Sequence, residues 1–219
     1  CFLHNGGFMI KIVIADDHEI VRAGLKQIIA DEEDMEVAGE ANNGENLIEM
    51  VKKNSYDVVL LDLKMSGMNG IEVMKHIKMI RPDIPVIVLS MHAEDQYAVR
   101  TIKAGASGYI TKETAGESLI TAIKKVVTGG KYISPTLAET LAESIAGGGN
   151  ELPHEHLTDR EFQVMCMIAS GKTVSEIGAE LFLSVKTIST YRQRILEKTS
   201  MKNNSELTHY VIKNNLLDI

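Results

Sequence analysis

The chain has 219 residues, of which 44% are hydrophobic and 24% are charged, and its formal net charge is −7. This composition is typical of a globular protein and excludes a disordered chain, while the length fits one large domain or two small ones. The acidic balance argues against a protein that coats DNA uniformly. No apolar run approaches the ~20 residues of a membrane-spanning helix, so we expect a soluble protein with no membrane partner.

The ends and the cysteines of the chain indicate its compartment. The first eight residues, CFLHNGGF, lack the basic and long apolar regions of a signal peptide, and we interpret Met9 as the natural start. Two cysteines cannot form a disulfide framework. Cys166 lies in the apolar run VMCMIA and is interpreted as a small buried thiol. We therefore expect a cytoplasmic protein.

Up to residue 128 the chain alternates short apolar runs with helical patterns. Strands are expected over residues 10–15, 35–40, 57–61, 85–90 and 107–110. The sequence from Thr114 to Glu117 has the pattern of a capping box and is expected to open the helix after the fifth strand. Five such runs separated by helices predict a doubly wound α/β fold with a five-stranded parallel sheet.

Chemically active side chains are expected to meet at one edge of this sheet, because parallel strands place their carboxyl ends together. The residues at or just after these ends are Asp16, Asp17, Asp62, Ser90 and the segment from Tyr109 to Lys112. Two carboxylates ~5 Å apart near a surface repel by roughly 3 kcal/mol, so a positive partner is required there. Three carboxylates, a hydroxyl and a lysine predict a site for a hard cation together with an anion.

Residues 129–157 are interpreted as an interdomain linker that contains a short helix. Gly129 and Gly130 end one helix, Ser134-Pro135 begins another, and GGGN (147–150) is a flexible break. The triplet His154-Glu155-His156 suggests a metal, but no other ligands stand at suitable spacing. A solvated linker is therefore the favoured interpretation of that triplet.

Residues 158–219 are expected to be entirely helical. Capping boxes from Thr158 to Glu161 and from Thr173 to Glu176, and a cap at Ser184, predict helices of ~12, ~8 and ~15 residues. A short helix followed by a longer basic one predicts a helix-turn-helix that binds DNA through its second helix. Residues 184–204 carry five basic residues and one acidic residue, which favours nucleic-acid contact over a merely solvated face. A last helix is expected over residues 205–216.

These residues, in this order, resemble the two-component response regulators of the NarL/LuxR type. The first set of motifs is Asp16-Asp17, LLDLKMSGMNG around Asp62, VIVLS up to Ser90, and GYITK. The second set is LTDREFQVMCMIASGKTVSEIGAEL followed by SVKTISTYRQRILEKTSM. The resemblance implies a flavodoxin-like receiver domain over residues 9–128, the linker over 129–157, and a LuxR-type helix-turn-helix domain over 158–219.

The resemblance also implies the roles of the receiver residues. Asp62 would be the phosphoacceptor, phosphorylated by a partner sensor histidine kinase in a reaction that depends on Mg²⁺. Lys112 and Ser90 would bind the phosphoryl oxygens, and Tyr109 would be a switch residue. The expected Mg²⁺ ligands are Asp16, Asp17, Asp62 and the backbone carbonyl of Lys64. The chain would then be no enzyme, since a receiver only accepts and slowly loses its own phosphoryl group.

In the output domain, the family register implies a DNA-binding surface on the longer basic helix. Ser189, Thr190 and Gln193 would face base edges. The candidates for phosphate contacts are Lys186, Arg192, Arg194 and Lys198. Phosphorylation would change dimerisation or domain arrangement and thereby sequence-specific binding to promoter DNA. The implied partners are a second copy of the chain, which would dock through the last helix, and RNA polymerase.

Two other functions also fit parts of this sequence. A regulator that binds DNA independently of phosphorylation remains the alternative. A phosphatase of the haloacid-dehalogenase type is disfavoured, because it needs an acid two residues after its nucleophile, where this chain has Lys64. The chain departs from the family pattern at Ser66, where proline is usual. Gly178 lies inside a predicted helix, which it should weaken by roughly 1 kcal/mol relative to alanine.

Overall fold

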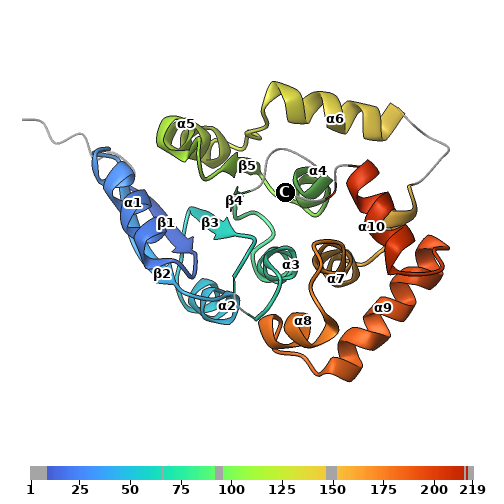
Figure 1. Cartoon of the computed structure of the whole chain (residues 1–219). Coiled ribbons are helices and arrows are strands. Elements are labelled where there is room, and N and C mark those ends of the chain that lie inside the picture. The colour runs from blue at the N-terminus through green and yellow to red at the C-terminus, as the bar shows by residue number, and fades with distance from the viewer. Residues whose placement is uncertain (1–8, 66, 92–95, 147–151, 215, 217–219) are drawn as a thin grey trace, which may run out of the picture. The chain divides into compact units, whose positions relative to one another are not determined.

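The computed structural model of the chain describes residues 9–65, 67–91, 96–146, 152–214 and 216 (Figure 1). Ser66, the GGGN segment and the residues before Met9 lie outside these described residues. The chain divides into two compact units, one of residues 1–91 and 100–133 and the other of residues 92–99 and 134–219. Among the described residues, no helix is both long enough and apolar enough to cross a membrane.

The first unit is built on a five-stranded parallel sheet, as the sequence predicted. Its strands are β1 (Ile10–Ala15), β2 (Met35–Ala41), β3 (Val58–Asp62), β4 (Val86–Ser90) and β5 (Gly108–Thr111). They lie in the order β2-β1-β3-β4-β5, so the chain crosses over between β2 and β3. The register pairs Ile12 with Val58, Leu60 with Ile87 and Leu89 with Ile110. Strands β3 and β4 are buried along their whole length, which explains their continuous apolar sequences.

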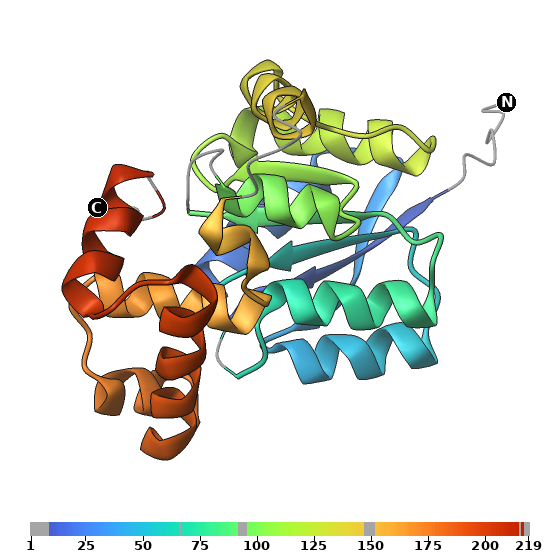
Figure 2. The ribbon, with the colours of Figure 1, turned by 90° about the vertical axis from the view of Figure 1, so that its right-hand side faces the viewer.

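Helices cover both faces of the sheet. They are α1 (Glu19–Ala30), α2 (Gly44–Lys53), α3 (Gly70–Ile80) and α5 (Ala115–Val127). Helix α4 (Gln96–Lys103) spans the division between the two units. Figure 2 shows the strands between α5 on one side and the pair α2 and α3 on the other. Leu25 of α1 and Leu119 of α5 share one apolar core with Leu60 of the sheet. This packing fixes the strands and leaves their carboxyl ends to carry the polar residues.

The predicted capping box at Thr114 is wrong, although α5 begins where it was expected. The Thr114 backbone is helical (φ −91°, ψ −1°) and its side chain makes no capping hydrogen bond. Instead, its hydroxyl donates to the backbone oxygen of Thr111 at 3.2 Å. The threonine thus stabilises the turn that leaves β5, and this local bond competes with the cap.

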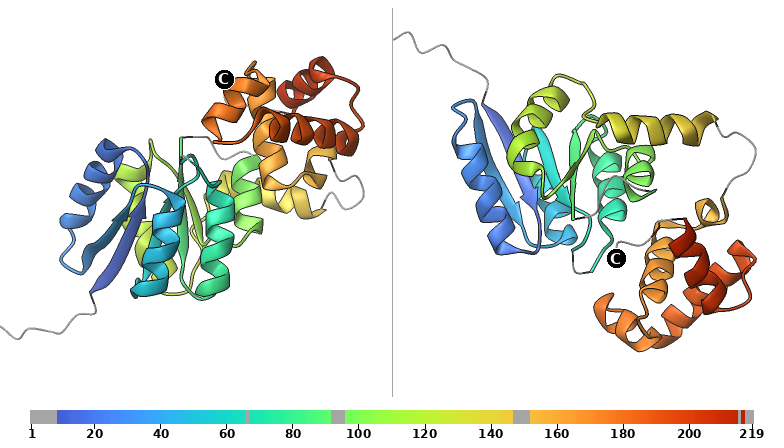
Figure 3. Two further views of the ribbon diagram at one scale, coloured as in Figure 1. Left: turned by 90° about the horizontal axis from the view of Figure 1, so that it is seen from below. Right: turned by 45° about the horizontal axis from the view of Figure 1, so that its top comes forward.

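The second unit is helical (Figure 3). Its elements are α6 (Pro135–Ala146), the 3₁₀ turn η1 (Pro153–His156), α7 (Asp159–Ala169), α8 (Val174–Glu180), α9 (Val185–Thr199) and α10 (Asn204–Lys213). The capping boxes at Thr158 and Thr173 and the cap at Ser184 are confirmed. The predicted helix over 205–216 is displaced, because Asn203 caps α10 and the helix ends at Lys213.

The core of this unit joins α7, α9 and α10. Phe162, Ile188, Ile195 and Val211 are buried together in one apolar cluster. The solvated-linker interpretation of His154 is wrong, because its side chain is only 1% exposed. Its Nδ1 lies 2.8 Å from the hydroxyl of Tyr210, and its ring packs at a tilt on Phe162. The 3₁₀ turn therefore belongs to the helical core.

Candidate functional site

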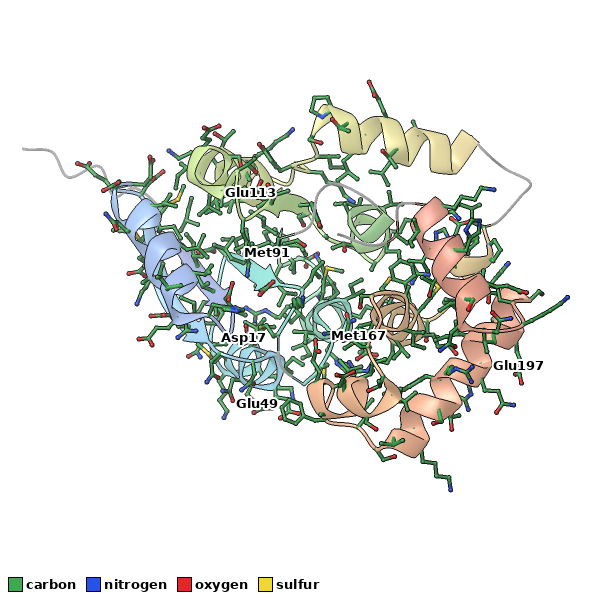
Figure 4. The ribbon with its side chains drawn as sticks, in the orientation of Figure 1. Asp17, Glu49, Met91, Glu113, Met167 and Glu197 are labelled. Carbon is green, nitrogen blue, oxygen red and sulfur yellow. The ribbon has the colours of Figure 1, made fainter. Side chains whose placement is uncertain are left out.

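The acidic residues meet at the carboxyl edge of the sheet, as predicted. Figure 4 labels Asp17, Met91 and Glu113, which closely follow β1, β4 and β5 and mark this edge. Asp16 and Asp62 are buried there, with exposed fractions of 0% and 1%. Two buried carboxylates at one place require compensation by a positive group.

Lys112 provides that compensation from the turn after β5. Its Nζ lies 2.7 Å from Oδ2 of Asp16 and 2.8 Å from Oδ2 of Asp62. Its backbone N–H donates to the backbone oxygen of Ser90 at 2.7 Å, which ties the ends of β4 and β5 together. Lys112 therefore supplies positive charge to Asp16 and Asp62, whereas the side chain of Asp17 contacts His18 in this cluster.

The pKa values of this cluster reflect both burial and charge. Burial raises the pKa of Asp62, and this effect exceeds the lowering by the hydrogen bond and charge of Lys112. Burial alone would lower the pKa of Lys112, but its contacts with the carboxylates of Asp16 and Asp62 and their charges raise it overall. One ammonium between two carboxylates leaves the buried cluster with an excess of acceptor groups.

The donor atoms at this edge fit a hard divalent cation. Single ligand atoms of Asp16, Asp17, His18 and Asp62 all lie within 4.8 Å of one another. Carboxylate oxygens are the protein ligands that Mg²⁺ prefers. The imidazole of His18 already contacts this group, with Nδ1 2.8 Å from Oδ1 of Asp17 and 3.2 Å from Oδ1 of Asp16. The residues present are therefore compatible with Mg²⁺.

Of the other predicted receiver residues, Lys64 and Ser90 lie at the same edge, whereas Tyr109 lies inside β5, opposite Val88 of β4. The backbone N–H of Lys64 donates to Oδ1 of Asp62 at 3.1 Å and so orients that carboxylate. Ser90 ends β4 and Tyr109 lies in β5, and both side chains are 1% exposed. The metal-ligand role of the Lys64 carbonyl and the roles of Ser90 and Tyr109 stay predictions.

Two supporting residues, Asn69 and Gly70, were missed in the sequence. Oδ1 of Asn69 accepts a hydrogen bond from the N–H of Ile71 at 2.8 Å and caps α3. A Cβ on Gly70 would lie 2.6 Å from Cα of Leu63 and 2.8 Å from the backbone oxygen of Asp62. Glycine is therefore required where α3 approaches the strand that carries Asp62. An Asn-Gly pair ahead of an apolar helix was the available signal.

In the helical unit, α9 presents most of the predicted DNA-binding side chains to solvent. Those exposed are Lys186, Ser189, Thr190, Gln193, Arg194 and Lys198, whereas Arg192 is half-buried. The hydroxyls of Ser189 and Thr190 donate to the backbone oxygens one turn earlier, at 2.9 and 3.0 Å. These hydroxyl oxygens retain their capacity to accept hydrogen bonds.

Three of these side chains also have partners inside the unit. Lys198 donates to the buried carboxylate of Glu161 at 2.6 Å. Arg192 donates through Nε to Oδ1 of Asn204 at 2.7 Å. Gln193 donates to Glu197, which Figure 4 labels, at 3.0 Å. These residues thus have structural roles in addition to any contact with DNA, and their predicted DNA roles are untested.

Comparison with protein families agrees with both units. The model of the response regulator receiver domain matches residues 12–124. The model of the bacterial regulatory proteins of the luxR family matches residues 155–211. The response regulator GacA of Pseudomonas aeruginosa is 38% identical over 211 residues, which are 96% of this chain and 99% of GacA. The chain belongs to the two-component response regulators of the NarL/LuxR type, with a receiver domain and a LuxR-type DNA-binding domain.

Solved structures with similar folds support this assignment. RcsB of Salmonella enterica serovar Typhimurium, bound to the promoter rprA in the presence of the phosphomimetic BeF₃⁻, is 26% identical with a TM-score of 0.64, over 93% of this chain and 98% of that chain. A structure of two RcsB dimers bound to two parallel DNAs is 27% identical with a TM-score of 0.59, at the same coverage.

Proposed function

We propose that Asp62 accepts a phosphoryl group from a sensor histidine kinase and that this modification controls DNA binding by the chain. The observation that carries the proposal is the buried Asp62 carboxylate, bonded to Lys112 and surrounded by ligand atoms of Asp16 and Asp17. A carboxylate becomes a nucleophile toward a phosphoryl group only where positive charge offsets the negative charge of both reactants.

Each residue of the edge has a proposed part in this reaction. Asp16, Asp17, Asp62 and the Lys64 carbonyl would hold Mg²⁺, which when bound supplies charge neutralisation for the transferred group. The Lys112 ammonium would replace its contact with one carboxylate oxygen by a contact with a phosphoryl oxygen. The Ser90 hydroxyl would donate a hydrogen bond to a second phosphoryl oxygen. Tyr109 is the proposed switch residue, which follows Ser90 when the phosphoryl group is present.

The phosphoryl donor is proposed to be the kinase, because the sequence has no GxxxxGK[ST] motif for nucleotide binding. The chain would accept and slowly lose its own phosphoryl group without turning over a separate substrate. The reaction would take place in the cytoplasm, where promoter DNA is accessible. The proposed domain boundaries are residues 9–128, 129–157 and 158–219, with the qualification that η1 packs with the last of these.

DNA binding is proposed to occur through α9 of a homodimer. RcsB, similar to this chain over nearly its full length, is described as bound to promoter DNA and as dimers on DNA. The proposed base-facing residues are Ser189, Thr190 and Gln193, and the proposed phosphate contacts are Lys186, Arg192, Arg194 and Lys198. RNA polymerase is a further proposed partner at the promoter.

The test is incubation with Mg²⁺ and acetyl phosphate, followed by intact mass and sedimentation. Wild type should gain one phosphoryl group and dimerise. Asp62→Asn should gain none, whereas the exposed control Asp31→Asn should behave as wild type. A phosphoryl adduct without dimerisation would keep the site and move the switch to domain arrangement. Absence of any adduct on wild type would refute the proposal.

A further inference from the structure

The turn between α8 and α9 has an unusual residue at its left-handed position. The N–H of Leu183 donates to the backbone oxygen of Gly178 at 2.8 Å, and the N–H of Phe182 donates to that of Ala179 at 3.4 Å. This pair of bonds is a Schellman motif, whose residue after the cap adopts positive φ. That residue is Phe182, with φ 54°. Side chains disfavour this conformation because Cβ crowds the following carbonyl oxygen.

The same chain uses glycine in the equivalent position of other helices. Gly129 after α5 and Gly171 after α7 have φ of 85° and 88°, and each makes the same pair of bonds with the residue that follows it. Among the described residues, the non-glycine residues with positive φ are Phe182 and Ser200. The backbone of the α8–α9 turn therefore gives no reason for a phenylalanine.

The ring of Phe182 contributes little to the core of the unit. The residue is 73% exposed, and Val185, three residues later, is 47% exposed. The left-handed backbone of Phe182 costs stability, and its exposed ring gains little burial within the unit to offset that cost. Residues held in disfavoured backbone conformations cluster at functional sites, so Phe182 is a candidate for a functional contact.

The position of Phe182 indicates what it meets. It lies two residues before Ser184, which caps α9, and is followed on that helix by the exposed Lys186 and Ser189. In a helix-turn-helix the first residues of the second helix approach the bases of the major groove. The charge of Lys186 suits the phosphates that border the groove.

We propose that Phe182 makes an apolar contact with double-stranded DNA at the edge of the groove that α9 enters. The contacted surface is carbon, either a thymine C5-methyl group or a deoxyribose ring. This inference rests on the proposed DNA binding through α9 and adds a contact that carries no charge.

The experiment measures binding of the full chain to a duplex of about 30 base pairs, long enough for two half-sites, which the wild type has selected from a random pool. Phe182→Asn tolerates the left-handed conformation but lacks the ring. We expect its affinity to fall about tenfold at every salt concentration, because no charge is removed. Phe182→Tyr should retain the affinity of wild type.

Two further variants separate this contact from other effects. Lys186→Ala should weaken binding and reduce the slope of log affinity against log salt by about 1, as loss of a phosphate contact does. Ser200→Gly relieves the other left-handed residue and should leave affinity unchanged. Hydrogen exchange of α8 and α9 amides should be as slow in Phe182→Asn as in wild type, or slower.

Replacing thymine by uracil throughout the duplex distinguishes the two carbon surfaces. If Phe182 contacts a methyl group, this replacement weakens wild type but not Phe182→Asn. If it contacts deoxyribose, the replacement affects both equally. Equal affinity of Phe182→Asn and wild type would overturn the inference, as would an affinity loss accompanied by faster exchange in α9. If Lys186→Ala has no effect while Phe182→Asn weakens binding, the contact of Phe182 is supported and the proposed phosphate contact of Lys186 is wrong.

Discussion

At the scale of single residues, Lys112 is the group on which the acidic edge depends. Replacement by methionine keeps much of the side-chain volume but leaves Asp16 and Asp62 buried without their shared cation. We expect Lys112→Met to destabilise the first unit by about 3–5 kcal/mol at neutral pH. Hydrogen exchange of the slowest amides of β1 and β3 measures this change.

The matched control is Lys124→Met, which removes an ammonium from an exposed ion pair with Glu32. Exposed pairs contribute little, so its effect should be much smaller than that of Lys112→Met. Similar losses for the two variants would show that the contact of Lys112 with the two carboxylates is no more important than a surface pair.

Glu161 gives the helical unit a defined acid sensitivity. Burial would raise the pKa of Glu161, but hydrogen bonds from Lys198 and Thr158 outweigh it and hold the pKa below the ordinary value of 4.5. A lowered pKa in the folded state stabilises the unit above pH 4.5, and this stabilisation is lost as the pH falls through the lowered value.

Glu161→Gln should therefore be less stable than wild type near neutral pH, and the difference should shrink as the pH falls below 4.5. Hydrogen exchange of α7 and α9 amides across this range measures it. A difference that is constant with pH would mean that the Glu161 charge does not contribute.

Some residues of the acidic edge could be predicted from the sequence, and others could not. Asp16, Asp62 and Lys112 were predicted because each follows a strand, and parallel strands bring these positions together. Gly70 was not, because its requirement comes from the backbone of Asp62 and Leu63, which only the folded chain brings near. His154 was misjudged for the same reason, since its partner Tyr210 is remote in sequence.

At the scale of elements, Gly178 allows the turn after α8 to pass close to that helix. A Cβ there would lie 2.8 Å from the backbone oxygen of Leu183, in the turn that leads to α9. Helix propensity alone predicts that Gly178→Ala gains about 1 kcal/mol. We expect the opposite, a destabilisation of about 1–3 kcal/mol, because the clash is with backbone.

Gly24→Ala in α1 is the control for this prediction, since a Cβ there meets nothing within 4 Å. It should stabilise its own unit by about 0.5–1 kcal/mol. Amide exchange in α8 and α9, compared with that in α1, measures both effects. A stabilising Gly178→Ala would contradict the close approach of the α8–α9 turn.

Helix starts followed from the sequence where the capping partner is local. Thr158 and Thr173 bond the glutamate three residues later, so the pattern contains the whole interaction. Thr114 has the same pattern but bonds Thr111 instead, because the turn from β5 brings that oxygen closer. The competing partner depends on the course of the chain before the helix.

At the scale of the whole molecule, negative and positive charge are distributed unevenly along the chain. The chain is acidic overall, with a net charge of −7, yet α9 is basic. Proposed DNA contacts of α9 therefore act against the long-range charge of the rest of the chain. Binding should weaken steeply as salt concentration rises, because phosphate contacts release counterions.

The coupling between Asp62 and DNA is the central claim, and equilibrium DNA affinity tests it most directly. The affinity of the full chain for its selected duplex is measured with and without acetyl phosphate and Mg²⁺, for wild type, Asp62→Asn and Asp31→Asn. Typical coupling free energies correspond to a 5–150-fold change, so about tenfold tighter binding is predicted for wild type and Asp31→Asn only. Equal affinities of wild type and Asp62→Asn under both conditions would contradict the claim and identify a regulator that binds DNA without phosphorylation.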